Sequence, residues 1–209
     1  MRKTLIILMF AAALSCSAGD GLEQLFAEEP GTLFNSLTYS ARYELLNKFK
    51  QNKPDEVLNN FQTTESRILK LSKDHLVVAT SSSRTVELKL IVQPKNDTVL
   101  AVLETVSTPV NDSRLSFYDL KWNRLDDSRF IVMPTAADFF VPKASKELRD
   151  ELLNQLSFAM IEMEFDGDTL VARCNLKDFY MGNDYKHYEP WVKPSVTYVL
   201  NKGKFKMKK

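Results

Sequence analysis

Beyond the first third of the chain, apolar and polar residues alternate with a period of two. In the segment TVELKLIV, for example, the apolar residues alternate with Glu87 and Lys89. Successive side chains of a strand point to opposite faces of a sheet, whereas helical side chains share a face every three or four residues. The alternation therefore predicts strands, and it favours an antiparallel sheet with one buried and one solvent-exposed face.

Five segments with this period follow one another between residues 66 and 122, namely SRILKLS, HLVVATSS, TVELKLIVQ, TVLAVLETVS and RLSFYDLKW. The turns that separate them are KDH, SSSR, PKND and PVNDS, which are rich in the residues typical of tight turns. Short turns join neighbouring antiparallel strands, so this region predicts a five-stranded meander. His75 lies in the first of these turns, where we expect an exposed side chain.

A helix and a second group of strands follow. The segment ASKELRDELLNQLSF predicts a helix that is capped by Ser145 and has leucines four residues apart. The strands AMIEMEF and TLVARCNL are joined by the turn DGD, and SVTYVLN and KFKMKK form a further hairpin. The C-terminal region therefore predicts one helix and a four-stranded meander.

Helices are also expected before the first sheet. The segment GLEQLFAEEPGTLFNSL predicts one or two short helices that are interrupted at the PG dipeptide. The segment SARYELLNKFKQ predicts another helix with Ser40 as its N-cap, and Tyr43, Leu46 and Phe49 recur three residues apart on its apolar face.

The predicted fold class is α+β, with two tandem halves in which one or more short helices are followed by an antiparallel meander sheet. The alternative is one large curved antiparallel sheet with the helices on one face. The expected organisation is a signal peptide over residues 1–18, a first half over 20–125, a connector over 126–144 and a second half over 145–209.

The N-terminus has the three parts of a secretory signal peptide. Arg2 and Lys3 precede the apolar run LIILMFAAAL, and the small residues of SCSAG follow it. The run is too short to span a bilayer stably, so no transmembrane segment is expected after cleavage. Cleavage after Ala18 gives a soluble exported protein, whereas lipidation of Cys16 gives an anchored lipoprotein.

The stretch from PGTLFNSLTYSARYELLNKF to RLSFYDLKWNRLD resembles an uncharacterised family of exported Bacteroidales proteins that carries a domain-of-unknown-function label. The shared features are the signal peptide, an early P-x-x-LF-x-x-L segment, a short helix and the strands TVELKLIV and SFYDLKW. The resemblance implies a Gram-negative anaerobe and a location in the periplasm or on the outer surface. It implies no reaction and no catalytic residues.

The chemistry of the chain excludes several classes of function. The net charge of +1 gives no basis for nucleic-acid binding. The two histidines lie far apart in sequence, and the chain has no metal-ligand spacing, nucleophile elbow or phosphate-binding glycine loop. We therefore expect no metal, no cofactor and no enzymatic activity.

One pair of carboxylates supports an alternative. Glu162 and Glu164 lie two residues apart on one face of a predicted strand, where they are able to reach the separation that a glycosidase uses. A carboxylate-dependent envelope hydrolase is therefore the second hypothesis. The same pattern also arises on the exposed face of any half-buried strand.

The stretch FYMGNDYKHYEPW is the strongest candidate for a binding surface. Its predicted binding residues are Tyr180, Asp184, Tyr185, Tyr188 and Trp191. Aromatic rings of this kind are enriched in recognition surfaces, and long loops are often functional. Alternatively, the rings pack onto the sheet and hold a long loop in place.

The leading hypothesis is an exported binding or scaffold module without enzymatic activity, whose partner is an envelope protein or glycan. A third possibility is a structural accessory of an outer-membrane complex. The family resemblance also implies O-glycosylation at Asp-Thr-aliphatic sites, which here are Thr98 and Thr169 at two predicted hairpin turns.

Overall fold

A computed structural model of the chain describes residues 18–53, 57–59, 65–94, 97–107, 109–141, 143, 145–156, 161–179 and 183–208. The predicted signal peptide up to residue 17, including Cys16, and the predicted binding residue Tyr180 lie outside the described residues.

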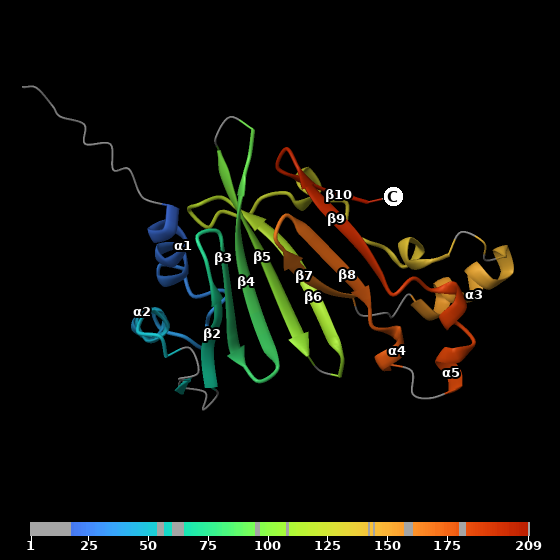
Figure 1. Cartoon of the computed structure of the whole chain (residues 1–209), viewed down its shortest axis with the longest axis horizontal. Coiled ribbons are helices and arrows are strands. Elements are labelled where there is room, and N and C mark those ends of the chain that lie inside the picture. Colours follow the sequence, from blue (N-terminus) through green and yellow to red (C-terminus); the bar gives the residue numbers. More distant parts are fainter. Residues whose placement is uncertain are drawn as a thin grey trace, which may run out of the picture.

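The first sheet is an antiparallel meander in which the strands lie in sequence order (Figure 1). Its six strands are β1 (Leu58–Asn59), β2 (Glu65–Leu71), β3 (His75–Ser81), β4 (Arg84–Val92), β5 (Thr98–Ser107) and β6 (Asn111–Tyr118). The five long strands are those that the period of two predicts, and β1 adds a two-residue edge strand.

The second sheet is also an antiparallel meander. Its four strands are β7 (Ile161–Asp166), β8 (Thr169–Cys174), β9 (Ser195–Asn201) and β10 (Lys204–Met207). Two separate sheets confirm the α+β fold with two tandem halves, and the alternative of a single large curved sheet is wrong.

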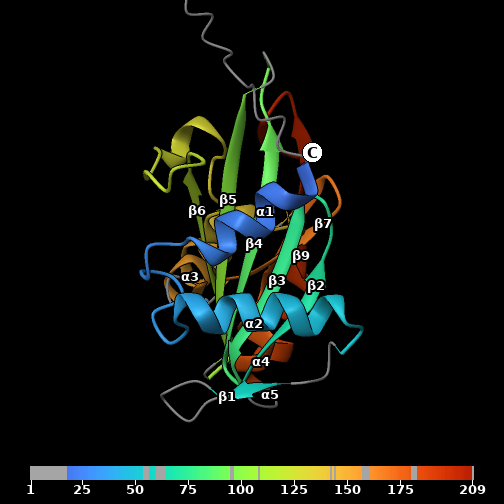
Figure 2. The ribbon, with the colours of Figure 1, turned by 90° about the vertical axis from the view of Figure 1, so that its left-hand side faces the viewer.

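Two helices, α1 (Ala18–Ala27) and α2 (Tyr39–Lys50), lie across one face of the first sheet (Figure 2). Leu22 and Phe26 of α1 and Leu45 and Leu46 of α2 are buried together with apolar side chains of β2 to β5. The prediction of Ser40 as the N-cap of α2 is wrong: Thr38 is the N-cap, because its hydroxyl accepts a hydrogen bond from the backbone N–H of Ala41 at 3.2 Å, and the helix therefore begins two residues earlier than predicted.

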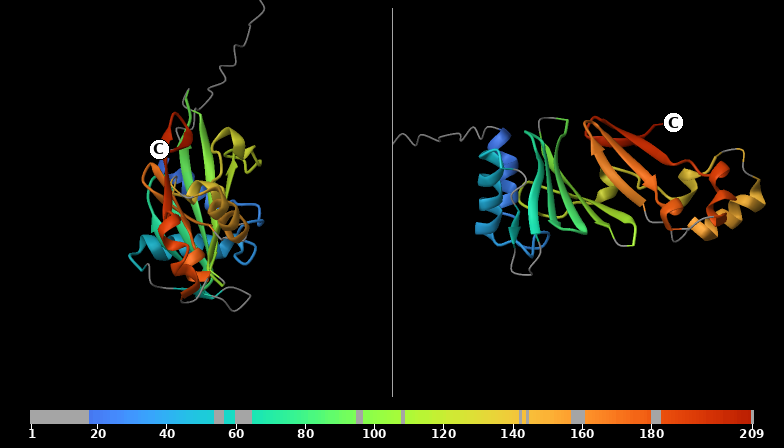
Figure 3. Two further views of the ribbon diagram at one scale, coloured as in Figure 1. Left: turned by 90° about the vertical axis from the view of Figure 1, so that its right-hand side faces the viewer. Right: turned by 60° about the horizontal axis from the view of Figure 1, so that its bottom comes forward.

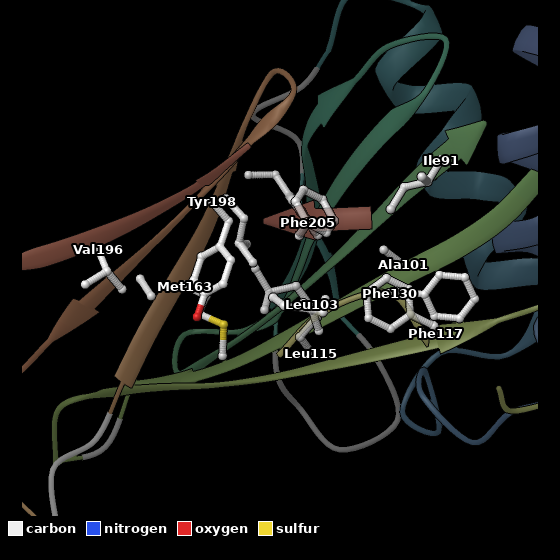
Figure 4. Close-up of a cluster of buried hydrophobic side chains, with 14 of the residues drawn as sticks. Ile91, Ala101, Leu103, Leu115, Phe117, Phe130, Met163, Val196, Tyr198 and Phe205 are labelled. Carbon is white, nitrogen blue, oxygen red and sulfur yellow. The ribbon is translucent and has the colours of Figure 1, made fainter. Parts of the chain in front are cut away.

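The second sheet covers the opposite face of the first, so the molecule has a layer of helices, a layer formed by the first sheet and a layer formed by the second (Figure 3). Figure 4 shows the apolar side chains that meet between the sheets. The first sheet contributes Ile91, Ala101, Leu103, Leu115 and Phe117, the second contributes Met163, Val196, Tyr198 and Phe205, and Phe130 comes from the segment between them.

The expectation of one solvent-exposed face on the first sheet is wrong over β4 to β6, which contribute to the core between the sheets. Lys89 is 3% exposed and Glu87 is 9% exposed, because the second sheet packs over that face. His75, which we expected in an exposed turn, begins β3 and is 4% exposed. Alternation shows which residues share a face, but it does not show whether that face is covered.

The buried polar side chains of this face have partners. The Nε2 atom of His75 lies 2.9 Å from Oε2 of Glu87, and the His75 ring meets the ring of Phe165 edge-on at 5.9 Å. The ammonium group of Lys89 donates to Oδ2 of Asp74 at 3.0 Å. Pairing of this kind is required because an isolated charge is very costly to bury.

Side chains of β6 join the two sheets along β7. The backbone N–H groups of Ile161 and Met163 donate to the Asp112 carboxylate at 3.1 Å and to the Ser113 hydroxyl at 2.9 Å. The side-chain amide of Asn175 donates to the carbonyl of Asn111 at 2.6 Å. The first two bonds satisfy backbone donors of the edge strand β7 without a continuous backbone ladder, and the third adds a side-chain contact after β8.

The remaining elements lie between the sheets in sequence or between β8 and β9. They are η1 (Asp127–Arg129), η2 (Ala136–Phe139), α3 (Lys146–Leu156), α4 (Leu176–Phe179), α5 (Asn183–Lys186) and η3 (Glu189–Trp191). Figure 1 shows α3, α4 and α5 together at the end of the second sheet that is far from α1 and α2. Within the described ranges, no helix has both the length and the apolar character needed to cross a membrane.

We predict that Glu87→Ala lowers the free energy of unfolding by about 2 kcal/mol, because it leaves a buried nitrogen of His75 without its partner. Glu164→Ala is the matched control, since that carboxylate is exposed on the outer face of the second sheet, and it should change the value by less than about 0.5 kcal/mol. Urea denaturation measures both values. Equal effects of the two variants would contradict the burial of Glu87 between the sheets.

Candidate functional site

The turn after α1 is organised by one buried carboxylate. Glu29 accepts hydrogen bonds from the backbone N–H groups of Gly31, Thr32, Leu33 and Phe34 at 2.9, 2.8, 2.9 and 3.4 Å. Burial alone would raise the pKa of Glu29, but the hydrogen bonds from Leu33, Thr32 and Gly31 outweigh it and lower the pKa. The carboxylate is therefore ionised inside the protein and fixes this turn.

A buried arginine connects this turn to α2. The guanidinium of Arg42 donates to the carbonyls of Ala27 at 2.9 Å, Glu29 at 2.6 Å and Leu37 at 2.9 Å. Its Nη1 also lies 3.6 Å from Oε2 of Glu29. Because Arg42 is buried, its charge requires these partners, and they set how α2 lies against the end of α1.

Two tyrosines of α2 are exposed to solvent. The buried residues of α2 are Arg42, Leu45 and Leu46, so the prediction that Tyr43 lies on the apolar face is wrong. Tyr39 and Tyr43 are 57% and 54% exposed. Their ring centroids lie 6.3 Å apart with an interplanar angle of 24°, so they present two nearly parallel faces.

These rings border a groove between α1 and α2, the two helices that face the viewer in Figure 2. The groove has a volume of about 350 Å³. Its lining residues are Glu23, Gln24, Ala27 and Glu28 from the α1 side and Tyr39, Tyr43, Leu46, Asn47 and Lys50 from α2. We call this set of residues the tyrosine groove.

The tyrosine groove combines flat apolar faces with hydrogen-bonding groups. Glu23 forms an ion pair with Lys50, and the side-chain amide of Gln24 donates to Glu28 at 3.0 Å. Two carboxylates and one ammonium group leave an excess of one negative charge among the lining residues. Such a surface suits a ligand that has an apolar face and several hydroxyl or amide groups.

The predicted aromatic loop has a different geometry. Tyr185, Tyr188 and Trp191 are partly buried and pack against the core between the sheets. The hydroxyl of Tyr188 donates to Glu151 at 3.2 Å, and burial raises the pKa of Tyr185. Of Asp184, the structure describes only the backbone, within α5. A binding role for this loop stays a prediction.

The two carboxylates of the hydrolase hypothesis have separate partners. Glu162 accepts a hydrogen bond from the side-chain amide of Asn111 at 2.8 Å, across the two sheets. Glu164 pairs with Arg173 at 2.9 Å on the exposed face. Neither of them lines the tyrosine groove. A catalytic role for these two residues stays a prediction.

The predicted glycosylation sites lie at hairpin ends and are partly buried. The backbone N–H of Thr98 donates to Asp97 at 2.9 Å, and the hydroxyl of Thr169 donates to the carbonyl of Asp166 at 2.7 Å. Modification of these residues stays a prediction. Cys174 is also partly buried, and burial raises the pKa of its thiol.

No group of three or more His, Cys, Asp or Glu side chains is arranged to hold a metal ion in the part of the chain that the structure describes.

The tyrosine groove was not predicted from the sequence. Tyr39 and Tyr43 lie four residues apart, which places them on one face of a helix. An arginine in a helix is normally assigned to solvent. With Arg42 facing solvent, the tyrosines are assigned to the apolar face of the helix. The acidic EEPG segment was the signal for a buried arginine, because its Glu29 is the buried partner of Arg42.

Comparison with protein families matches residues 13–205 to the family described as "Protein of unknown function (DUF3256)". The fold is similar to that of a solved domain of an uncharacterized protein from Porphyromonas gingivalis W83, with a TM-score of 0.78 and 21% sequence identity. The similarity covers 90% of this chain and 99% of that domain, and at this identity it shows a shared fold alone. A search of curated proteins gave no match.

We predict that Glu29→Gln lowers the free energy of unfolding at pH 7 by about 3 kcal/mol, because it removes the buried charge that pairs with Arg42. The pKa of Glu29 is lowered in the folded state, so its contribution is complete above the unfolded pKa of about 4.3 and is lost as the pH falls through the folded pKa. The difference in the free energy of unfolding between wild type and variant should therefore become smaller in strong acid.

Urea denaturation of both proteins at pH 7 and pH 3 measures this difference. Glu28→Gln, next to it but exposed, is the matched control and should have little effect at either pH. A difference between wild type and Glu29→Gln that stays constant across this range would contradict the role of the ionised carboxylate.

Proposed function

Because the chain belongs to the DUF3256 family of proteins of unknown function, we propose its function from its own sequence and surface: it is a non-enzymatic binding module of the bacterial cell envelope that recognises a glycan. The observation that carries this proposal is the tyrosine groove, where two parallel exposed rings border a cavity with carboxylate and amide groups.

The proposed location rests on the N-terminal sequence. The basic residues, the apolar run and the small residues that follow have the order of a secretory signal peptide. The resemblance to exported Bacteroidales proteins supports the periplasm or outer surface of a Gram-negative bacterium. The exported protein has two possible forms: a soluble form that is cleaved after Ala18 and a form that is lipidated at Cys16. The mass of the protein purified from its native envelope distinguishes them.

The chemistry of the tyrosine groove favours a sugar. The face of a tyrosine ring is electron-rich, so it attracts the C–H groups on the flat face of a pyranose ring. The hydroxyl groups at the edge of a sugar find acceptors in Glu23 and Glu28 and both donors and acceptors in Gln24 and Asn47. The two tyrosines are exposed, so their ring faces are accessible to a ligand.

The size and the charge of the groove narrow the ligand. A volume of about 350 Å³ lies within the range of about 300–1,000 Å³ that is usual for small-ligand sites. A stable protein interface requires about 800 Å² on each partner, which is more than a short groove of this kind offers. The excess of one negative charge among the lining residues disfavours uronic and sialic acids. Neutral and amino sugars are therefore the expected ligands.

We predict that the purified protein binds neutral or N-acetylated oligosaccharides on a glycan array more strongly than acidic ones. The double variant Tyr39→Ala/Tyr43→Ala should lose at least about 10-fold in affinity, since each stacked ring contributes about 0.5–1.5 kcal/mol beyond the area it buries. Titration calorimetry with the best array ligand measures the loss.

The aromatic loop supplies the control for this experiment. Trp191 follows α5 closely in sequence, and Figure 1 shows α5 at the end of the molecule that is far from α1 and α2, so Trp191→Ala should leave the affinity unchanged. Loss of binding in Trp191→Ala but not in the double tyrosine variant would move the site to the loop. If the wild type, the double tyrosine variant and Trp191→Ala all retained the same protein partner equally, that result would contradict glycan recognition in the groove.

A further inference from the structure

A second cavity lies at the opposite end of the molecule from the tyrosine groove. It is bordered by η2, by α3 and by the end of β10, and Figure 1 shows α3 at the end of the second sheet that is far from α1 and α2. Its volume is about 540 Å³, and its lining residues are Ala137, Asp138, Phe140, Arg149, Leu153, Lys193, Met207 and Lys208. We call this set of residues the basic cleft.

One part of the basic cleft is apolar. Of its apolar lining residues, Phe140 is buried, Met207 is partly buried, and Leu153 of α3 is 39% exposed. Covering exposed apolar surface with a ligand stabilises the complex by about 25 cal/mol for each Å² removed from water. A ligand with a flexible apolar body would therefore gain free energy by lying against these three side chains.

The other part of the cleft is positively charged. Three cationic side chains and one carboxylate line it, so 3 − 1 leaves an excess of two positive charges, although the whole chain is nearly neutral. The carboxylate of Asp138 is already engaged, since it accepts hydrogen bonds from the backbone N–H and the hydroxyl of Thr135 at 2.7 and 2.8 Å.

Lys193 is the central cation of this part. Its ammonium group donates to the backbone carbonyl of Asp138 at 3.2 Å, which orients the side chain without neutralising its charge. Lys208 is exposed at the rim, where its charge is available to a ligand. An ammonium group held in position beside an apolar surface attracts a carboxylate or a phosphate more strongly than it does in open water.

We propose that the basic cleft binds an anionic amphiphile, with its acyl chain against Phe140, Leu153 and Met207 and its carboxylate or phosphate near Lys193 and Lys208. The charge of the lining selects the anionic headgroup, and the exposed apolar wall selects the chain. The volume lies within the usual range for small-ligand sites. This site is separate from the tyrosine groove and does not depend on the glycan-binding proposal.

The test uses the purified full-length protein and three probes that share one acyl chain: myristate, the corresponding lysophosphatidate and the neutral monoacylglycerol, all below their micelle concentrations. Titration calorimetry should give micromolar binding of both anionic probes and at least 10-fold weaker binding of the neutral one. The two anionic probes together show whether the headgroup is a carboxylate, a phosphate or either.

The double variant Lys193→Gln/Lys208→Gln should bind the anionic probes at least 10-fold more weakly and bind the neutral probe with unchanged affinity. Lys206→Gln is the matched control, because Lys206 is an exposed lysine of β10 that does not line the cleft. Leu153→Ala, at an exposed position, should lower the affinity for all three probes.

Three results would overturn the proposal: no binding of any probe, equal losses in the double variant and in Lys206→Gln, or equal binding of the neutral and anionic probes. Binding of a peptide with an apolar C-terminal residue in the absence of amphiphile binding would assign the cleft to a protein terminus instead.

Discussion

A sheet that is covered on both faces has to supply a partner for every polar group that its strands carry inward. In this protein the first sheet lies between α1 and α2 on one side and the second sheet on the other, so the strands β3 and β4 carry charged residues into the interior. His75 pairs with Glu87, and Lys89 pairs with Asp74. Replacement of these pairs by apolar residues need not destabilise the fold, whereas loss of one partner does.

The same requirement applies under α1 and α2, next to the surface that we assign to ligand binding. Glu29 and Arg42 are buried under the helices, where Glu29 organises the turn after α1 and Arg42 bonds to three carbonyls around it. Tyr39 and Tyr43 of the same helix are exposed and border the tyrosine groove. A buried ion pair thus fixes how the two helices that form the tyrosine groove pack against each other.

The sequence predicted the strands well because the period of two is a local property. It identified the five long strands of the first sheet, the four strands of the second and the turns at residues 166–168 and 201–203. It did not predict the burial of Glu87 and His75, because the covering sheet lies more than seventy residues further along the chain. It also misassigned Tyr43, because the apolar face of α2 includes a buried arginine whose partner precedes the helix.

The central claim is that the tyrosine groove holds a neutral sugar, and chemical-shift mapping with an N-acetylglucosamine trimer tests it most directly. In two-dimensional NMR spectra of the ¹⁵N-labelled protein, the account predicts saturable shifts at the backbone amides of Gln24, Glu28, Tyr43 and Asn47. Shifts that are confined to residues 183–193, or spectra that do not change at millimolar trimer, would contradict it.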